Sequence, residues 1–228
     1  MRSPADLLAR RVVPRAVVAV SQISWPARVG AATRRRLGRR GCVELFFAFD
    51  DPCSAIAVID LAARVAGRDV RLVLRPVVRR GIADDPAVAQ KRRYAIEDAR
   101  RLGRRAGLTL SRPEPLSADS TAWLAEWAAS APQGPALIGF CVQALEQLWF
   151  ATEGAVDAAD YAVVWRRQFD AEPVTADARA VRRNESLMAR RGPYDTPAAC
   201  VHGQWFFAHD RLAQIGERLD ELGWTVAA

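Results

Sequence analysis

The fold is decided by the stretch Gly192-Pro193-Tyr194-Asp195-Thr196-Pro197-Ala198-Ala199-Cys200-Val201-His202-Gly203-Gln204-Trp205-Phe206-Phe207-Ala208-His209-Asp210-Arg211-Leu212. Two short apolar runs flank the turn glycine of His202-Gly203-Gln204, which predicts a β-hairpin. Pro197 heads the first run. Because proline cannot donate to a strand ladder, the peptide bond before it is a candidate for the cis form. Asp210 stands where a helix N-cap is expected, ahead of the periodic Leu212, Ile215, Leu219 and Leu222.

This order of a proline-headed strand, a hairpin partner and a closing helix resembles the C-terminal half of a thioredoxin-like domain. Within it, Phe206-Phe207-Ala208-His209-Asp210-Arg211-Leu212 resembles the aromatic-rich strand and Gly-x-Asp-Arg segment of 2-hydroxychromene-2-carboxylate isomerases and kappa-class glutathione transferases. Ala208 stands where those families usually have glycine. An ordinary β-hairpin followed by a helix is the alternative that these residues alone leave open.

A strand, a helix and a second strand are expected upstream. The apolar and aromatic run from Cys42 to Phe49 predicts a buried strand. After Asp50-Asp51-Pro52, residues 54–66 have helical content that ends at Gly67. The alternation of apolar and polar residues over 69–76 predicts the second strand. A short return between the two strands implies a right-handed parallel crossover.

Residues 84–191 carry almost only helical signals, with segments near 90–102, 121–130, 135–152, 158–170 and 177–190. In the first segment, Lys91-x-x-Tyr94-x-x-x-Asp98-x-x-Arg101 resembles a Lys-x-x-Tyr-x-x-x-Asp helix of the same isomerase family, although a solvated face explains its many arginines. Tyr94 and Asp98 are expected to tie the helical block to itself. We predict an α/β protein: a thioredoxin-like domain (42–83 and 192–228) with a large all-helical insertion (84–191), preceded by a basic N-terminal arm (1–41).

The net charge of +7 over 228 residues is unevenly distributed. Residues 1–40 hold ten Arg and one acid, Asp6, so they carry +9 and the remaining residues sum to −2. The positive charge therefore belongs to the arm, and without interleaved aromatic residues a nucleic-acid partner is not expected. We expect a solvated or docking arm; the alternative is a surface that contacts an acidic partner or a membrane.

The four cysteines, Cys42, Cys53, Cys141 and Cys200, form no Cys-x-x-Cys pair and no zinc-ligand spacing. With two His in the chain, no metal site is expected. Scattered single cysteines fit a reducing cytosol, so a cytoplasmic location is expected. No apolar run approaches the roughly 18 residues of a membrane span. Whether the chain forms a homodimer is left open.

Asp51-Pro52-Cys53-Ser54, at the junction of the first strand and first helix, is the position that decides function. It resembles Ser-Pro-Tyr-Ser of the isomerases and kappa transferases, where the serine donates to the thiolate of bound glutathione, and Cys-Pro-x-Cys of DsbA-type oxidoreductases. Asp51 and Ser54 at the outer positions exclude a dithiol mechanism. Asp51, an acceptor only, either caps the helix or serves as a base. Cys53 and Ser54 are the two residues that could take over the role of the missing serine. Cys53 would then be a nucleophile, and otherwise it is a small buried hydrophobe.

The resemblance also implies a thiol-binding wall far along the chain. The backbone of Thr196, before a cis Pro197, would pair with the cysteinyl part of a glutathione-like thiol, and Asp210 with His209 would hold the γ-glutamyl ammonium. The alternatives are an N-cap role for Asp210 and a surface position for His209. All these roles require that the helix starting near Asp51 faces residues 196–197.

Two functions follow from these residues. The resemblance implies an enzyme, a thiol-cofactor-dependent isomerase or transferase that uses glutathione or another low-molecular-weight thiol on a small conjugated or aromatic carboxylate. The alternative is a thioredoxin-fold binding or scaffold protein that has lost the thiol-activating residue and has no redox activity.

Overall fold

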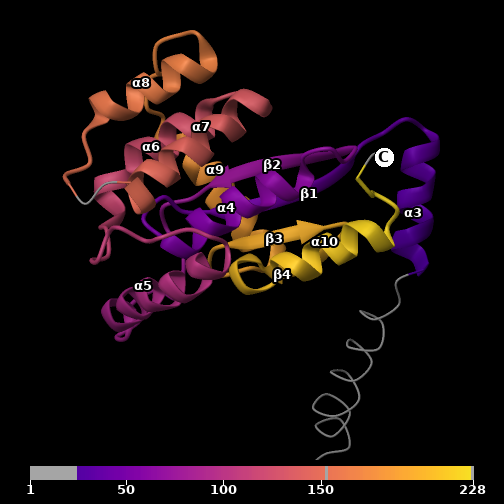
Figure 1. Cartoon of the computed structure of the whole chain (residues 1–228), viewed down its shortest axis with the longest axis horizontal. Coiled ribbons are helices and arrows are strands. Elements are labelled where there is room, and N and C mark those ends of the chain that lie inside the picture. The colour runs from indigo at the N-terminus through magenta and orange to yellow at the C-terminus, as the bar shows by residue number, and fades with distance from the viewer. Residues whose placement is uncertain (1–24, 152–153, 227–228) are drawn as a thin grey trace, which may run out of the picture.

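The computed structural model describes residues 25–151 and 154–226. Its elements in chain order are α3 (Trp25–Arg36), β1 (Gly41–Phe47), α4 (Pro52–Val65), β2 (Val70–Pro76), α5 (Val88–Arg105), α6 (Ala118–Ser130), α7 (Pro135–Glu146), the π-helical turn η2 (Gln147–Ala151), α8 (Ala158–Phe169), α9 (Ala178–Arg191), β3 (Ala198–Val201), β4 (Gln204–Phe207), the 3₁₀ turn η3 (Ala208–Asp210) and α10 (Leu212–Glu221). Figure 1 shows their arrangement. The predicted α/β fold class is confirmed.

The four strands form one sheet in the order β2-β1-β3-β4. β1 and β2 are parallel, as the strand-helix-strand pattern predicts, whereas β3 is antiparallel to both β1 and β4. His202 and Gly203 connect β3 to β4 with φ angles of 49° and 84°. A two-residue hairpin turn with two positive φ values matches the right-handed twist of the strands, which explains the glycine at its second position.

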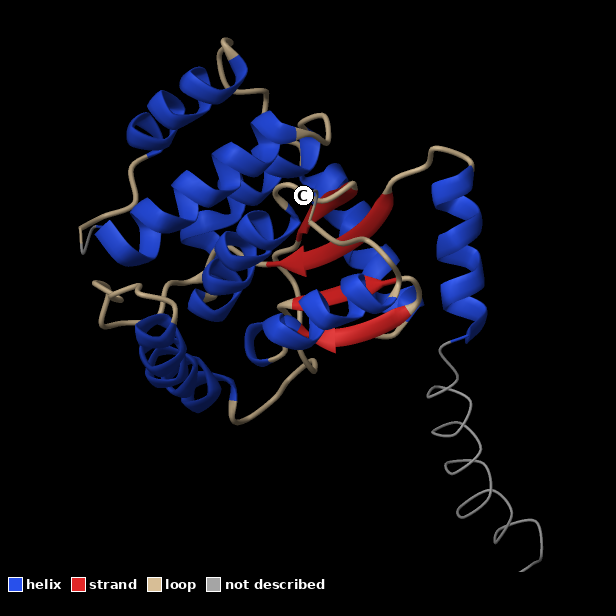
Figure 2. Ribbon diagram, turned by 45° about the vertical axis from the view of Figure 1, so that its right-hand side comes forward, coloured by secondary structure: helices blue, strands red, loops and turns tan. Residues whose placement is uncertain are grey.

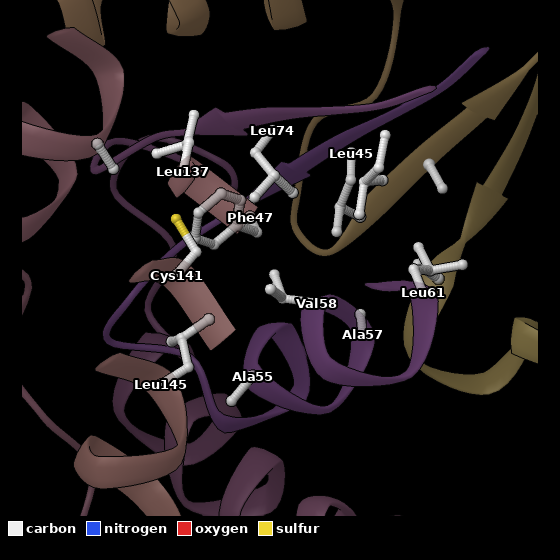
Figure 3. Packing of buried hydrophobic residues seen from close by; sticks show 14 of the residues in the cluster. Leu45, Phe47, Ala55, Ala57, Val58, Leu61, Leu74, Leu137, Cys141 and Leu145 are labelled. Carbon is white, nitrogen blue, oxygen red and sulfur yellow. The ribbon is translucent and has the colours of Figure 1, made fainter. Parts of the chain in front are cut away.

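The main core lies between the sheet and the helices α4, α7 and α10. Alternate residues of β1, Val43, Leu45 and Phe47, are fully buried on this face because side chains alternate along a strand. Figure 3 shows Leu45 and Phe47 over Val58 of α4, with Leu137, Cys141 and Leu145 of α7 closing the same layer. Helix α4 is therefore fixed between the sheet and α7, and its first turn has a defined position.

The opposite face of the sheet is covered by α9. Phe46 of β1 packs there with Met188 of α9, and its ring centroid lies 6.0 Å from that of Trp205 on β4. Figure 2 shows the strands with helices on both sides. A sheet covered on both faces buries its central strand completely, which accounts for the nearly continuous apolar run in β1.

The five helices predicted for the insertion are all present. Gln133 joins this block to the outer edge of the sheet: its side-chain amide accepts from the N–H of Leu74 (2.9 Å) and donates to the carbonyl of Leu74 (2.8 Å). Trp149 makes a second connection, donating from Nε1 to the carbonyl oxygen of Phe49 (2.9 Å). The insertion thus satisfies backbone groups at the edge of β2 and at the end of β1.

Residues 1–24 of the predicted arm lie outside the described residues. The following segment forms α3, whose Ala31 is fully buried, and the Arg35 guanidinium lies 5.3 Å from the ring centroid of Trp224. Arg35 also donates to the carbonyl of Leu222. This part of the basic segment docks on the C-terminal end of the domain. Across the described ranges, no helix is both long and apolar enough to span a bilayer.

Candidate functional site

Asp51 caps the N-terminus of α4. Its Oδ1 accepts from the N–H of Cys53 and its Oδ2 from the N–H of Ser54, both at 3.1 Å. The Ser54 hydroxyl donates to the same Oδ2 at 2.6 Å and accepts from the N–H of Ala48 at 3.2 Å. The capping role considered for Asp51 is confirmed. Ser54, at 0% exposure, serves this network and does not reach a ligand.

The two distant segments of the expected site do meet. Asp51 and Cys53 line one side of a cleft of about 580 Å³, and Thr196 and His209 line it as well. The peptide bond between Thr196 and Pro197 is cis, the form for which the sequence makes it a candidate. The start of α4 and residue 196 therefore share a cavity of the size that small-molecule ligands occupy.

A partly buried arginine stands beside Asp51. Arg80 donates to Oδ1 of Asp50 (2.7 Å) and lies 3.8 Å from the Asp195 carboxylate. The Asp50 side chain is only 2% exposed, and its second oxygen lies 3.9 Å from Arg92. Although burial opposes its charge, the nearby Asp50 and Asp51 hold the pKa of Arg80 above its ordinary value. The group is thus a permanent cation in the cleft wall.

Burial raises the pKa of Asp51 above its ordinary value, because desolvation disfavours the carboxylate. The charge of Arg80 and the Ser54 hydrogen bond act in the opposite direction, and the charge of Asp50 adds to the effect of burial. A carboxylate with a raised pKa that lines a cleft is the environment in which general bases are found.

Thr196 faces the cleft with its backbone donor already engaged. Its N–H donates to Oδ1 of Asp195 at 2.8 Å. Its hydroxyl oxygen is buried and, among the described residues, has no hydrogen-bond partner. A buried hydroxyl without a partner indicates a place where a ligand or water completes the structure.

No protein-family description and no curated protein matches this sequence. Among solved structures, a 2-hydroxychromene-2-carboxylate isomerase superposes with a TM-score of 0.59 and 12% identity, over 80% of this chain and 96% of the isomerase chain. The chain has a DsbA-like thioredoxin fold. Proteus mirabilis ScsC is similar over 96% of this chain and 93% of its own, with 11% identity and a TM-score of 0.48. A linker-deletion variant of ScsC matches over 99% and 98%, with 12% identity and a TM-score of 0.45.

Cys53 is the second residue of α4. It is 6% exposed, packs with Ile56 and Ala99, and its Sγ lies 3.8 Å from the carbonyl oxygen of Ala95. Burial raises the pKa of the Cys53 thiol, and the charge of Asp51 raises it further. The reading as a small buried hydrophobe is therefore favoured over that of a low-pKa nucleophile.

Asp210 does not cap α10, so that prediction is wrong. The N–H of Arg211 bonds to the carbonyl of Ala208 (3.3 Å), which closes a 3₁₀ turn that includes Asp210 and makes Arg211 the N-cap. Asp210 is half exposed and lines a separate hollow of about 480 Å³, although its charge still raises the pKa of Cys53. Its role toward a γ-glutamyl group stays a prediction, as do the other binding roles.

Helix α5 contributes Arg92, Tyr94 and Asp98 to the cleft, and the sequence had not assigned any of them to a binding site. Tyr94 is 60% exposed and Asp98 pairs within its own helix with Arg101 (3.5 Å), so the expectation that they tie the helical block to itself is wrong. Both line the cleft, and so does Arg92. Throughout the described ranges, no group of three His, Cys, Asp or Glu is placed to hold a metal ion.

Arg80 is the site residue that sequence reasoning missed. A signal for it was present, because Asp50-Asp51 follows β1 and Arg79-Arg80-Gly81 follows β2. Loops after the carboxyl ends of two adjacent parallel strands lie at the same edge of a sheet. Once the strands are predicted to be parallel, the pairing of a carboxylate from one loop with an arginine from the other can be expected.

Proposed function

We propose that this protein is an isomerase or transferase that uses glutathione or another low-molecular-weight thiol as cofactor. The substrate class is a small conjugated or aromatic carboxylate, to which the thiol adds and from which it later leaves. The observation that carries the proposal is Asp51, a buried carboxylate with a raised pKa that shares a cleft of about 580 Å³ with Thr196.

In this proposal Asp51 is the base that takes the thiol proton. Its Oδ2 already accepts two hydrogen bonds, but from the described residues its Oδ1 accepts only one, from Cys53, and so keeps a lone pair for the proton. When that oxygen receives the S–H proton, Asp51 becomes neutral and no longer repels the thiolate. The sulfur then forms a bond to the electrophilic carbon, and the proton returns as the C–S bond breaks.

Cations of the cleft wall support the binding of two negative groups. Arg80, permanently charged, balances the thiolate, while Arg79 and Arg92 are positioned for a substrate carboxylate. Tyr94, exposed on the same wall, offers a flat surface to an aromatic or conjugated substrate. The reaction needs no net electron transfer and therefore no pair of cysteines. This agrees with the described residues of the cleft wall, which include one cysteine, Cys53.

A reducing compartment such as the cytoplasm belongs to the same proposal, because it keeps the cofactor in its thiol form. The four cysteines Cys42, Cys53, Cys141 and Cys200 are all free. Free cysteines are usual where glutathione and thioredoxin systems keep thiols reduced.

One observation favours the second candidate, a binding or scaffold protein. The N–H groups of Cys53 and Ser54 are taken by Asp51, and the N–H of Thr196 is taken by Asp195. A thiol ligand that needs these donors has to displace an internal carboxylate first. In a scaffold, such internal hydrogen bonds would simply close a site that has lost its ligand.

Thermal unfolding with reduced glutathione separates the two candidates. If the dissociation constant is about 1 mM, 10 mM ligand stabilises the folded state by about 1.4 kcal/mol. That raises the melting temperature by about 3–6 °C for a chain of this size. S-methylglutathione, which has no thiol proton to remove, is the matched ligand control. No shift with glutathione, cysteine or another thiol at 10 mM would favour the scaffold and contradict the enzyme.

A further inference from the structure

Another hollow, whose described lining residues differ from those of the cleft, is walled by arginines. It has a volume of about 590 Å³ and lies beside α9, where that helix meets α6 and β2. Five arginines line it: Arg75, Arg179, Arg182, Arg183 and Arg190. None of its described lining residues is a carboxylate, and none of them also lines the thiol cleft. The hollow is thus a concentrated positive site, independent of the proposed thiol chemistry.

Two carboxylates near α9, Glu185 and Glu44, are occupied by other donors, and of the hollow's arginines they reach only Arg75. Glu185 of the same helix accepts from the backbone N–H groups of Val78 (3.2 Å) and Arg79 (2.7 Å). Glu44 on β1 accepts from Arg75 (2.9 Å) and from Arg191, so its charge is shared by two guanidinium groups. Glu185 and Glu44 therefore do not neutralise the charges of the other four arginines of the hollow.

Three of the five arginines, Arg182, Arg183 and Arg190, form no ion pair with any described residue, and Arg179 has only a 3.9 Å contact with the helix cap Asp177. Arginines three and four residues apart on one helix repel each other. The arrangement is local, since residues 41–228 together carry a net charge of −2. A cluster that destabilises its own helix becomes favourable when an anion binds in it.

We propose that the arginine hollow binds a small polyanion that carries several phosphate groups. Guanidinium groups form paired hydrogen bonds to phosphate oxygens, and α9 and β2 direct five of them to one cavity. The volume falls in the usual range for small ligands. A concave wall fits a compact molecule better than a flat membrane. Because the described residues of the wall include no aromatic side chain, they offer no stacking surface for the bases of a nucleic acid.

The test is calorimetric titration of the full chain with sodium tripolyphosphate at about 100 mM NaCl. The variant Arg182→Ala/Arg183→Ala removes two exposed cations from the hollow. Arg104→Ala/Arg105→Ala is the matched control, because these are also adjacent, exposed arginines, on α5. The α9 pair is expected to weaken binding at least tenfold and the control pair less than twofold. The N-terminal segment is the same in all proteins, so its own attraction for anions cancels.

A second double variant, Arg179→Ala/Arg190→Ala, is expected to weaken tripolyphosphate binding by the same factor. The melting temperature shows whether each variant folds, and the second variant provides the test if the first does not fold. Equal losses in the α9 and α5 pairs, or no binding of tripolyphosphate by the wild type, would overturn the proposal. The proposal would also be overturned if the α9 variants weakened the binding of a single-stranded RNA or of an anionic phospholipid vesicle but not the binding of tripolyphosphate.

Discussion

The Asp51 network is the part of the site whose energetics can be worked out from the structure. Substituting Asp51→Ala removes a helix cap, worth about 1 kcal/mol, and leaves the buried N–H of Ser54 and the Ser54 hydroxyl without their acceptor. An unsatisfied buried polar group costs about 1–3 kcal/mol. Relief of the buried charge offsets part of this. We expect a net loss of about 2–3 kcal/mol, or about 4–12 °C in melting temperature.

Asp51→Asn is the matched variant, because asparagine caps helices about as well as aspartate and carries no charge. It is expected to lie within about 1 kcal/mol of the wild type at acidic pH. The raised pKa of Asp51 means that the folded state binds this proton more tightly than the unfolded state does. The stability contributed by this group is therefore full below the unfolded value near 3.8 and is lost as pH rises through the folded-state value.

The assay is urea unfolding of the wild type and of both variants at pH 4.5, 6 and 8. Relative to the wild type, Asp51→Asn should gain stability as the pH rises, while Asp51→Ala stays the less stable of the two variants throughout. An Asn variant that loses stability relative to wild type with rising pH would show that the folded-state pKa is lowered. The argument that makes Asp51 a base would then be refuted.

Three further predictions follow from the same contacts. Asp51→Ser should leave bound glutathione in its thiol form at pH 7, because a hydroxyl cannot take the thiol proton as Asp51 does in the proposal; a thiolate absorbance as strong as that of the wild-type complex would contradict the role of Asp51 as the base. Arg80→Met should cost about 3–5 kcal/mol in urea unfolding by leaving the buried Asp50 with only its 3.9 Å contact to Arg92, and a loss below 1 kcal/mol would show that the pair is solvated. Gln133→Ala should cost about 1–3 kcal/mol by removing both hydrogen bonds to Leu74, whereas the exposed Gln90→Ala should change stability by less than 0.5 kcal/mol.

Local pattern was sufficient for the four strands and for the helices from α4 onward, but not for α3, which lies in the segment expected to be a basic arm. The run of β1, the glycine after α4 and the His202-Gly203 turn each depend on neighbours in sequence, so their physics can be read without a fold. The prediction that Asp210 caps α10 failed because local pattern does not distinguish two kinds of turn. A 3₁₀ turn and an α-helix start use similar residues, and the choice between them depends on the bond from the N–H of Ala208 to the carbonyl of Pro197 (2.8 Å), which anchors that turn.

By itself, the sequence determined the α/β pattern, the place of the helical block and the absence of a second cysteine between Asp51 and Ser54. Only the tertiary structure decided which charges meet. Arg80 lies 30 residues from Asp50 and 115 from Asp195 along the chain, and it pairs with Asp50 because β1 and β2 run parallel and end at one edge of the sheet. Pairing energy depends on distance and on exclusion of water, and both are set by packing across the fold.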